Sequence, residues 1–248
     1  MKYGVALLSV AISLCAAGIV ERQPEIQFVE NGFSGECTTS RYWDCCKPTC
    51  SWVGNTDTSI GPVKSCAIDG SSDIDGNVQS GCEDNGNAYM CSAQQGVIVN
   101  STLAYGFAAV AFISPPENMC CTCMLVEFNG GGWGDCGEGK TMIVQITNTG
   151  GTSSANSTEN NIEIAIPGGG VGYYTQGCKK QWNAPDQGWG DQYGGVETEA
   201  ACDDLPAVLQ PGCKFRWTFL NGCSNPNAKF TQVVCPQEIV DISGCKMD

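Results

Sequence analysis

The sequence predicts a mainly β domain, either a closed barrel or a sandwich, held together by disulfide bonds. Several short runs alternate apolar and polar residues, as strands with one buried face do, and residues 141–147 and 162–166 are the clearest. Helical signals are short. Eighteen of the 248 residues are Cys, and they are spread along the chain, which indicates one stapled domain.

The individual elements follow from these patterns in chain order. Strands are expected at residues 124–128, 141–147, 162–166, 215–219 and 230–234, and helices at residues 104–112 and 197–202. Asn129-Gly130 and Asn221-Gly222 are turn signals. No internal repeat and no Pro/Ser/Thr linker divides the chain.

The N-terminus is typical of an exported protein. Lys2 precedes an apolar run, and small residues at 15–18 offer a cleavage site, so residues 1–18 are predicted to be a secretory signal. A membrane anchor is the alternative, but the run is barely long enough to span and Glu21 ends it. Residues 19–36 then form a short tail, and residues 37–248 form a single secreted domain with N-glycosylation acceptors at Asn100 and Asn156.

Charge and composition exclude several function classes. The net charge is −14 and the sequence contains no His. An acidic chain repels phosphate backbones, so no nucleic-acid partner is expected. Without His, a Ser-His-Asp triad cannot be built and usual zinc sites are improbable, so no metal is predicted. Acid–base chemistry near neutral pH must therefore depend on carboxylates.

The cysteine count gives a further expectation. Seventeen remain after the signal is removed, so at least one is unpaired or pairs with another molecule. Metal binding by Cys120-Cys121-x-Cys123 is the competing interpretation. The absence of His and the wide spread of the Cys favour disulfides.

Two segments contain carboxylates that are candidates for catalysis. Asp44 lies among aromatic residues and Cys that can hold it rigidly, and Glu163 lies on the opposite face of a strand from Ile162, Ile164 and Ile166. Taken alone, each pattern is explained better without a catalytic role. Asp44 would then be a surface residue beside core aromatics, and Glu163 would be a solvent-facing residue of a strand.

Longer motifs show a family resemblance. The densest segment reads Thr39-Ser40-Arg41-Tyr42-Trp43-Asp44-Cys45-Cys46-Lys47-Pro48, and further matches occur in order at residues 105–108, 120–123, 140–142, 148–151, 166–172, 192–195, 210–213 and 235–240. The chain thereby resembles glycoside hydrolase family 45, and within it the insect-type branch. These are secreted endo-β-1,4-glucanases that act by inversion on a six-stranded double-psi β-barrel. This resemblance overturns both non-catalytic explanations.

The resemblance implies roles for four residues. Asp44 occupies the position of the family's general base. Glu163 occupies the position of the general acid, which three residues separate from Pro167. Tyr42 and Trp52 fall on aromatics that line the substrate cleft. The implied partner is a β-1,4-glucan of the plant cell wall, acted on by a monomer without metal or organic cofactor, because two carboxyl groups and water suffice.

Two departures from the family pattern bear on substrate and rate. Glu163 stands where the family usually has Asp, and insect-type members with this exchange are directed more to xyloglucan than to cellulose. Thr152 stands where the family often has an assisting Asp, so one source of a raised acid pKa is lost. Reduced activity on crystalline cellulose is the expected consequence.

Three cysteines are additional to the family set, whose fourteen members pair as seven bridges. The family pattern joins the positions of Cys123 and Cys235, expected on adjacent antiparallel strands. Cys136 lies 13 residues after the first and Cys223 lies 12 before the second. On two antiparallel strands joined at one point, residues that lie nearly equally far from that point face one another. A Cys136–Cys223 bridge is therefore expected, with Cys37 left as the unpaired thiol.

Two other functions compete with hydrolysis. An expansin-like, non-hydrolytic wall-loosening protein shares the barrel but lacks the base carboxylate. A disulfide-rich defence or inhibitor protein predicts no open aromatic-lined groove and no dependence on Asp44.

Overall fold

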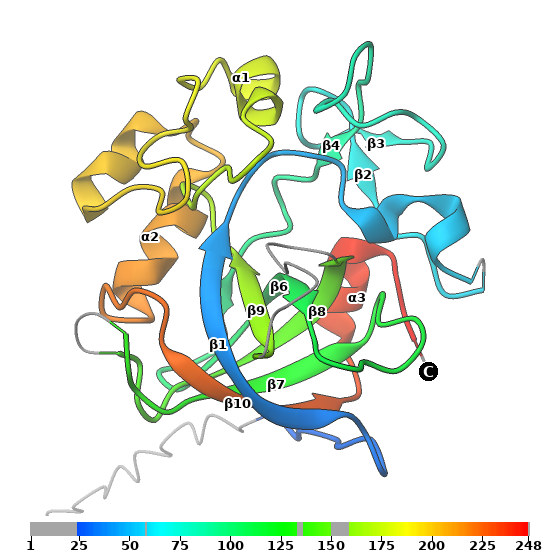
Figure 1. Ribbon diagram of the computed structural model, residues 1–248, viewed down its shortest axis with the longest axis vertical. Helices are drawn as coiled ribbons and strands as arrows, with labels where there is room; N and C mark the ends of the chain where they lie inside the picture. The colour runs from blue at the N-terminus through cyan, green and yellow to red at the C-terminus, as the bar shows by residue number, and fades with distance from the viewer. Residues whose placement is uncertain (1–23, 58, 133–135, 150–158, 248) are drawn as a thin grey trace, which may run out of the picture.

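Six strands close a barrel in the computed structural model, which describes residues 24–57, 59–132, 136–149 and 159–247 (Figure 1). Around the barrel the order is β6, β8, β7, β10, β1 and β9, which pairs again with β6. The bounds are β1 Ser34–Tyr42, β6 Leu103–Ala111, β7 Cys123–Phe128, β8 Thr141–Thr149, β9 Asn161–Ala165 and β10 Asn227–Val233. The predicted six-stranded β-barrel is confirmed. Its first strand begins at Ser34, within the segment expected as a tail.

Strand direction determines which residues meet. β1 runs parallel to β9 and antiparallel to β10, while β9 runs antiparallel to β6. In this register Glu163 lies between Ser40 of β1 and Ala109 of β6. The strand that holds Glu163 is therefore paired on both sides, which fixes its backbone.

The barrel interior is filled by alternate side chains of each strand. On β9, Ile162 and Ile164 are buried in one cluster with Met142, Val144 and Phe230 from strands across the barrel. Fully burying side chains of this size stabilises the fold by roughly 1.5–3 kcal/mol each. The expectation that the Ile residues share the core face is confirmed, and Glu163 points to the other face.

Two sequence predictions of secondary structure are wrong. Residues 104–112 were expected to be helical, but all of them except Phe112 lie in β6, whose nine residues are all buried. An apolar run without alternation arises when both faces of a strand are covered, as here by the barrel interior and by α3 (Gln237–Ser243). Residues 215–219 were expected to be a strand, but they form the end of α2 (Gln210–Thr218) and its C-terminal cap, Phe219. There Phe215 and Phe219 stack, four residues apart, on one helix face.

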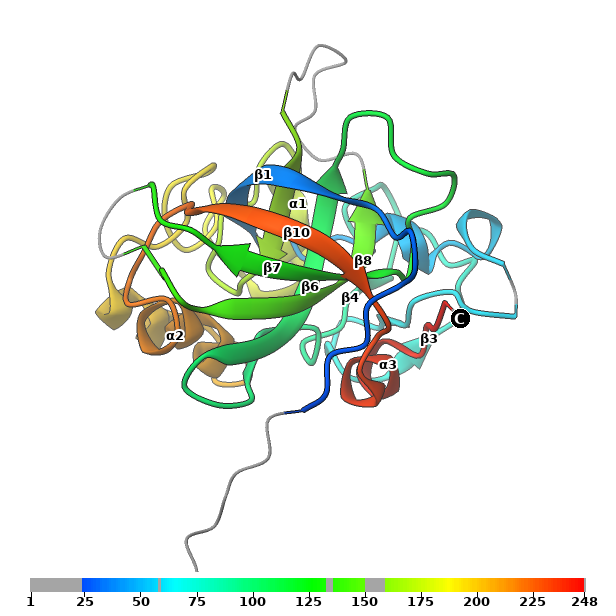
Figure 2. The same ribbon diagram turned by 90° about the horizontal axis from the view of Figure 1, so that it is seen from below.

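The loops hold the remaining elements. They are β2 Ser65–Cys66, β3 Asp73–Ile74, β4 Tyr89–Met90, β5 Val97–Ile98, α1 Gln176–Trp182 and 3-10 helices at Thr49–Ser51, Val53–Asn55 and Glu199–Asp204. The last of these overlaps the helix expected at 197–202. Figure 2 shows β1, β10 and β7 side by side, with α2 near one end of the barrel and α3 near the other. None of the helices in the described part is long and apolar enough to cross a bilayer.

Eight disulfides staple the described residues. They are Cys45–Cys178, Cys46–Cys82, Cys50–Cys120, Cys66–Cys91, Cys121–Cys245, Cys123–Cys235, Cys136–Cys223 and Cys202–Cys213. The run at 120–123 thus forms disulfides. The expected Cys136–Cys223 bridge is confirmed, with 4.6 Å between Cα atoms, and buried Cys37 is the free thiol among the cysteines that the structure describes.

Removing the Cys136–Cys223 bridge should cost stability. Its cysteines are 87 positions apart, so the double change to Ser should lower the free energy of unfolding by about 2–4 kcal/mol, measured by denaturation without reductant. Cys37→Ala is the control, because it removes no bridge. With all eight bridges formed, the denatured protein without residues 1–18 should contain one free thiol. Finding three would contradict the Cys136–Cys223 bridge.

Candidate active site

An open groove of about 510 Å³ lies where the ends of β1 and β8 approach the middle of β9. All four residues singled out in the sequence line it, namely Tyr42, Asp44, Trp52 and Glu163. They come from three separate segments of the chain. The structure thus gathers the two candidate carboxylates and the two candidate aromatics at one place.

Asp44 follows the end of β1, where the chain is tied to the segment after β9. The amide of Ile166 donates to the Tyr42 carbonyl, and the amide of Trp43 donates to the Gly170 carbonyl. The glycines in this segment allow the approach, because a Cβ at Gly169 would lie about 2.9 Å from the Tyr42 backbone. The Pro-Gly-Gly-Gly stretch therefore brings the chain beyond Glu163 against the chain that holds Asp44.

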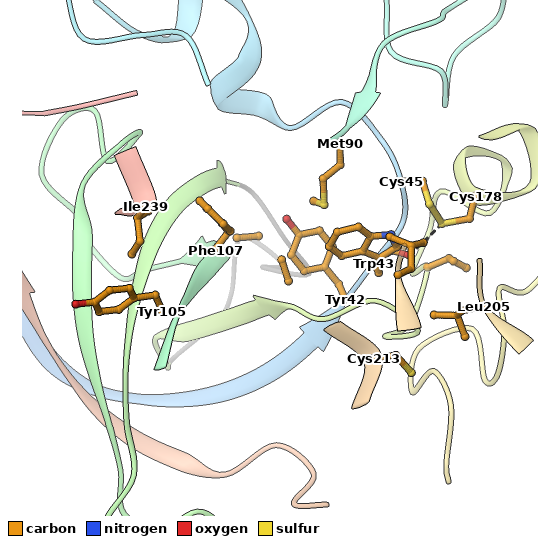
Figure 3. Packing of buried hydrophobic residues seen from close by; sticks show 14 of the residues in the cluster. Tyr42, Trp43, Cys45, Met90, Tyr105, Phe107, Cys178, Leu205, Cys213 and Ile239 are labelled. Atoms are coloured by element: carbon orange, nitrogen blue, oxygen red, sulfur yellow. Dashed lines mark hydrogen bonds between the residues drawn. A yellow bond between two sulfur atoms is a disulfide. The ribbon is translucent and has the colours of Figure 1, made fainter. Parts of the chain in front are cut away.

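The backbone around Asp44 is fixed from behind. Cys45 adopts a left-handed conformation (φ 62°), and the amide of Cys46 donates to Asp44 Oδ1 at 3.0 Å. Cys45 and Cys46 are each bridged to another segment, and Gly177 at the start of α1 packs so closely that a Cβ there would overlap the Asp44 carbonyl oxygen. Figure 3 shows the Cys45–Cys178 bridge beside Trp43. These contacts leave Asp44 one backbone position.

Glu163 reaches the groove from β9. It is partly exposed, whereas its neighbours Ile162 and Ile164 are buried in the barrel. Fully buried Ala165 follows on the same face and leaves room beside the carboxylate. Thr152, at the position of the family's assisting Asp, lies outside the described residues.

Burial and charge determine the protonation of Asp44. Removal from water raises its pKa from 3.8 to about 6, the hydrogen bond from Cys46 opposes this rise, and the nearby Glu163 carboxylate adds to it whenever it is ionised. The two carboxylates are therefore close enough to influence one another. Asp44 carries a negative charge above about pH 6.

The two aromatics differ in how much surface they offer. Tyr42 is mostly buried. Its burial is the main cause that raises the pKa of its hydroxyl, and the charge on Asp44 is the second cause. Figure 3 shows Tyr42 and Trp43 among the buried residues of one core cluster. Trp52 is partly exposed in the groove, so it presents more surface to a ligand.

The sequence analysis did not identify several residues of the groove. Tyr173 and Tyr174 lie at its rim with their rings packed edge to face, and Tyr173 is 83% exposed. Gln79 and Lys47 line it as well. The position of the tyrosines directly after the Pro-Gly-Gly-Gly-Val-Gly motif was the available signal, but exposure depends on the fold.

Comparisons with known proteins identify the family of the chain. The description "Glycosyl hydrolase family 45" matches residues 34–246. An endoglucanase from Phaedon cochleariae is 51% identical over 229 residues, which cover 92% of this chain and 90% of that protein. An endoglucanase from Cryptopygus antarcticus is 42% identical over 88% of this chain and 92% of its own length.

A solved structure extends the likeness to the fold. The crystal structure of a cellulase from the Antarctic springtail Cryptopygus antarcticus has a TM-score of 0.78 and 42% identity, covering 86% of this chain and 98% of that one. The family match spans every strand of the barrel and every groove residue named above. On sequence and fold together, the chain belongs to glycosyl hydrolase family 45.

Proposed function

We propose that this protein is an inverting endo-β-1,4-glucan hydrolase of plant cell-wall polysaccharide. The observation that carries the proposal is the groove that holds Asp44 and Glu163 together with exposed aromatic surface. An open groove accepts a chain along its length, so internal bonds can be cut. The family and the relatives named as endoglucanases support the same activity.

The two carboxyl groups divide the work. Glu163 protonates the glycosidic oxygen as the bond to the anomeric carbon breaks, and Asp44 removes a proton from the water that attacks this carbon from the opposite face. Asp44 gains the proton that water loses, and Glu163 loses one to the leaving sugar. No metal or organic cofactor is needed, because two carboxyls and water balance the reaction.

The pH profile should show the titration of Asp44. A base must be ionised, so kcat/KM should fall on the acid side with an apparent pKa of about 6, well above an ordinary Asp. Initial rates of reducing-end release between pH 4 and 8 measure this. An acid limb near pH 4 would contradict the assignment.

Xyloglucan is the proposed preferred substrate over cellulose. Glu163 is one methylene longer than Asp, which suits a glucan whose side branches hold its backbone further from the acid. Wild-type protein should show higher kcat/KM on xyloglucan than on carboxymethyl-cellulose, and Glu163→Asp should shift the ratio toward carboxymethyl-cellulose. Equal ratios in both proteins would refute this substrate assignment without refuting hydrolysis.

An expansin-like role is the alternative that the assay must separate. Such a protein binds and loosens polysaccharide without creating reducing ends. Asp44, the base that this class lacks, is present in the groove. Release of new reducing ends, lost in Asp44→Asn, supports the hydrolase, and binding without release supports the alternative.

Export and a monomeric single domain, expected at residues 37–248 and extended by β1 to begin at Ser34, complete the proposal. Eight disulfides suit an oxidising compartment, as does the predicted signal at residues 1–18. Expression in insect cells should place the protein in the medium with its N-terminus near residue 19 and a glycan on Asn100 or Asn156. Light scattering should give a monomer mass, and retention in the cells would contradict export.

A further inference from the structure

Lys47 is a buried lysine at the wall of the groove for which the proposed chemistry has no use. It is only 5% exposed, and its ammonium donates to the carbonyls of Gly76 (2.6 Å) and Val78 (2.9 Å). The ion pairs formed among the described residues do not include it. A buried charge costs free energy unless it is well solvated by protein groups, so this arrangement requires a reason.

The same ammonium lies against Trp52. Its nitrogen is 3.5 Å from the centre of the indole ring. An ammonium nitrogen in the plane of the ring and this close to its centre would overlap the ring's own C–H groups. The nitrogen must therefore lie over one face of the indole. A cation over an indole face is attracted by the π electrons, most strongly when it is shielded from water. Of the two faces, only the opposite one is left to a ligand.

The indole has few other restraints. In the part of the chain that the structure describes, its Nε1 takes part in no hydrogen bond. The backbone is held by the short 3-10 turns that flank Trp52 and by the nearby Cys50–Cys120 bridge. Backbone restraint leaves rotation of the side chain open, so contact with the Lys47 ammonium restrains the ring orientation.

Lys47 also links two neighbouring segments that line the groove. The turn that supplies the Gly76 and Val78 carbonyls packs against the segment of Trp52, since a Cβ at Gly76 would lie 2.9 Å from Val53 Cγ2, and it leads directly into Gln79 and Ser80, which line the groove. The Ser80 hydroxyl accepts from the Lys47 amide at 3.3 Å. One side chain thus touches the aromatic surface and the backbone of the adjacent turn.

We propose that Lys47 is a positioning residue that holds the Trp52 indole flat against the groove wall as a preformed surface for a glucose ring of the substrate. The inference rests on the proposed function, because it names how that groove binds its polysaccharide. Preorganising the ring removes the cost of ordering it on binding, so the effect belongs in binding and not in bond cleavage.

A double-mutant cycle on Lys47 and Trp52 tests the proposal. Lys47→Met and Trp52→Ala should each raise KM for a long xyloglucan oligosaccharide about tenfold, equivalent to about 1.4 kcal/mol, and change kcat less than threefold. The double variant should be no worse than Trp52→Ala, because Lys47 acts through the ring. Additive losses, or an equal loss of kcat, would overturn the proposal.

Two further variants guard the result. Lys47→Gln removes the charge but keeps an amide donor for the carbonyls, so it carries the cycle if Lys47→Met fails to fold. Lys140→Met is the matched control, since the Lys140 ammonium also bonds a carbonyl (Ser101) and faces a ring (Phe219, 5.0 Å), but away from the groove. It should leave KM unchanged.

A measurement without substrate separates this inference from the proposed function. In protein labelled with 5-fluorotryptophan, the ¹⁹F resonance of Trp52 is the one that disappears in Trp52→Phe. This resonance should shift and broaden in Lys47→Met. The resonance of Trp217 should not change. An unchanged Trp52 resonance overturns the role of Lys47 whether or not the protein hydrolyses glucan. A protein that shows the shift but releases no reducing ends refutes the hydrolase proposal alone.

Discussion

Replacing Asp44 by Asn should reduce hydrolysis of xyloglucan and carboxymethyl-cellulose at least about 10³-fold, within the range that general acid–base catalysis contributes. Asn keeps the size and can still accept the hydrogen bond from the Cys46 amide, so the change removes only the capacity to take a proton from water. Reducing-end assays at pH 7, where Asp44 is ionised, measure the loss. Turnover like that of the wild type would refute the role of Asp44.

The same variant should be more stable than the wild type at neutral pH. The pKa of Asp44 in the fold, about 6, exceeds its ordinary 3.8, so the fold favours the protonated form. The stability linked to this shift is complete below pH 3.8 and is lost as pH rises through 6. An uncharged Asn avoids this loss, and after allowance for partial solvent exposure the gain at pH 7 should be about 1–2 kcal/mol.

Denaturant unfolding at pH 3.5 and pH 7 measures the difference between the two proteins. The gain should appear at pH 7 and vanish at pH 3.5. An inactive variant that is also less stable at pH 7 would mean that the substitution damages the fold, and the loss of activity would then not identify a base.

Replacing Glu163 by Gln should also abolish hydrolysis of the polymers, by about 10²–10⁴-fold, but through a different step. A sugar hydroxyl is a poor leaving group unless its oxygen is protonated, and Gln cannot supply the proton. A dinitrophenolate leaves without protonation. Glu163→Gln should therefore keep most of the wild-type rate on a dinitrophenyl cello-oligosaccharide.

The pair of variants separates the two roles. Asp44→Asn should lose activity on both the polymer and the dinitrophenyl substrate, because both still need activated water. The Glu163→Gln variant should lose only the first. Equal losses on both substrates in Glu163→Gln would show that Glu163 is not the acid.

Some features of the fold follow directly from the sequence. Alternation places Ile162 and Ile164 inside and Glu163 outside, and the structure has them so. Nearly equal spacing from Cys123 and Cys235 predicted the Cys136–Cys223 bridge, because β7 and β10 are antiparallel neighbours. The first prediction depends on the two-residue period of a strand, which local sequence carries, and the second also needs the Cys123–Cys235 pairing that the family resemblance implies.

Other features depend on contacts that the local sequence does not contain. Residues 104–112 show no alternation, because packing covers both faces of β6, and the run then resembles a helix. Lys47 meets carbonyls 29 and 31 positions further along the chain. Tyr173 is exposed only because the turn after Gly170 lies at the groove rim. Such long-range neighbours have no local pattern from which to be predicted.

The shape of the first sugar released tests the central claim most directly, that Asp44 and Glu163 lie on opposite sides of one bond with water between the base and the anomeric carbon. Proton NMR of a β-1,4-linked oligosaccharide, recorded within the first minutes of hydrolysis, distinguishes the anomers before mutarotation. The proposed arrangement predicts that the α-anomer forms first. First formation of the β-anomer would contradict it, because retention needs a carboxylate in direct contact with the anomeric carbon.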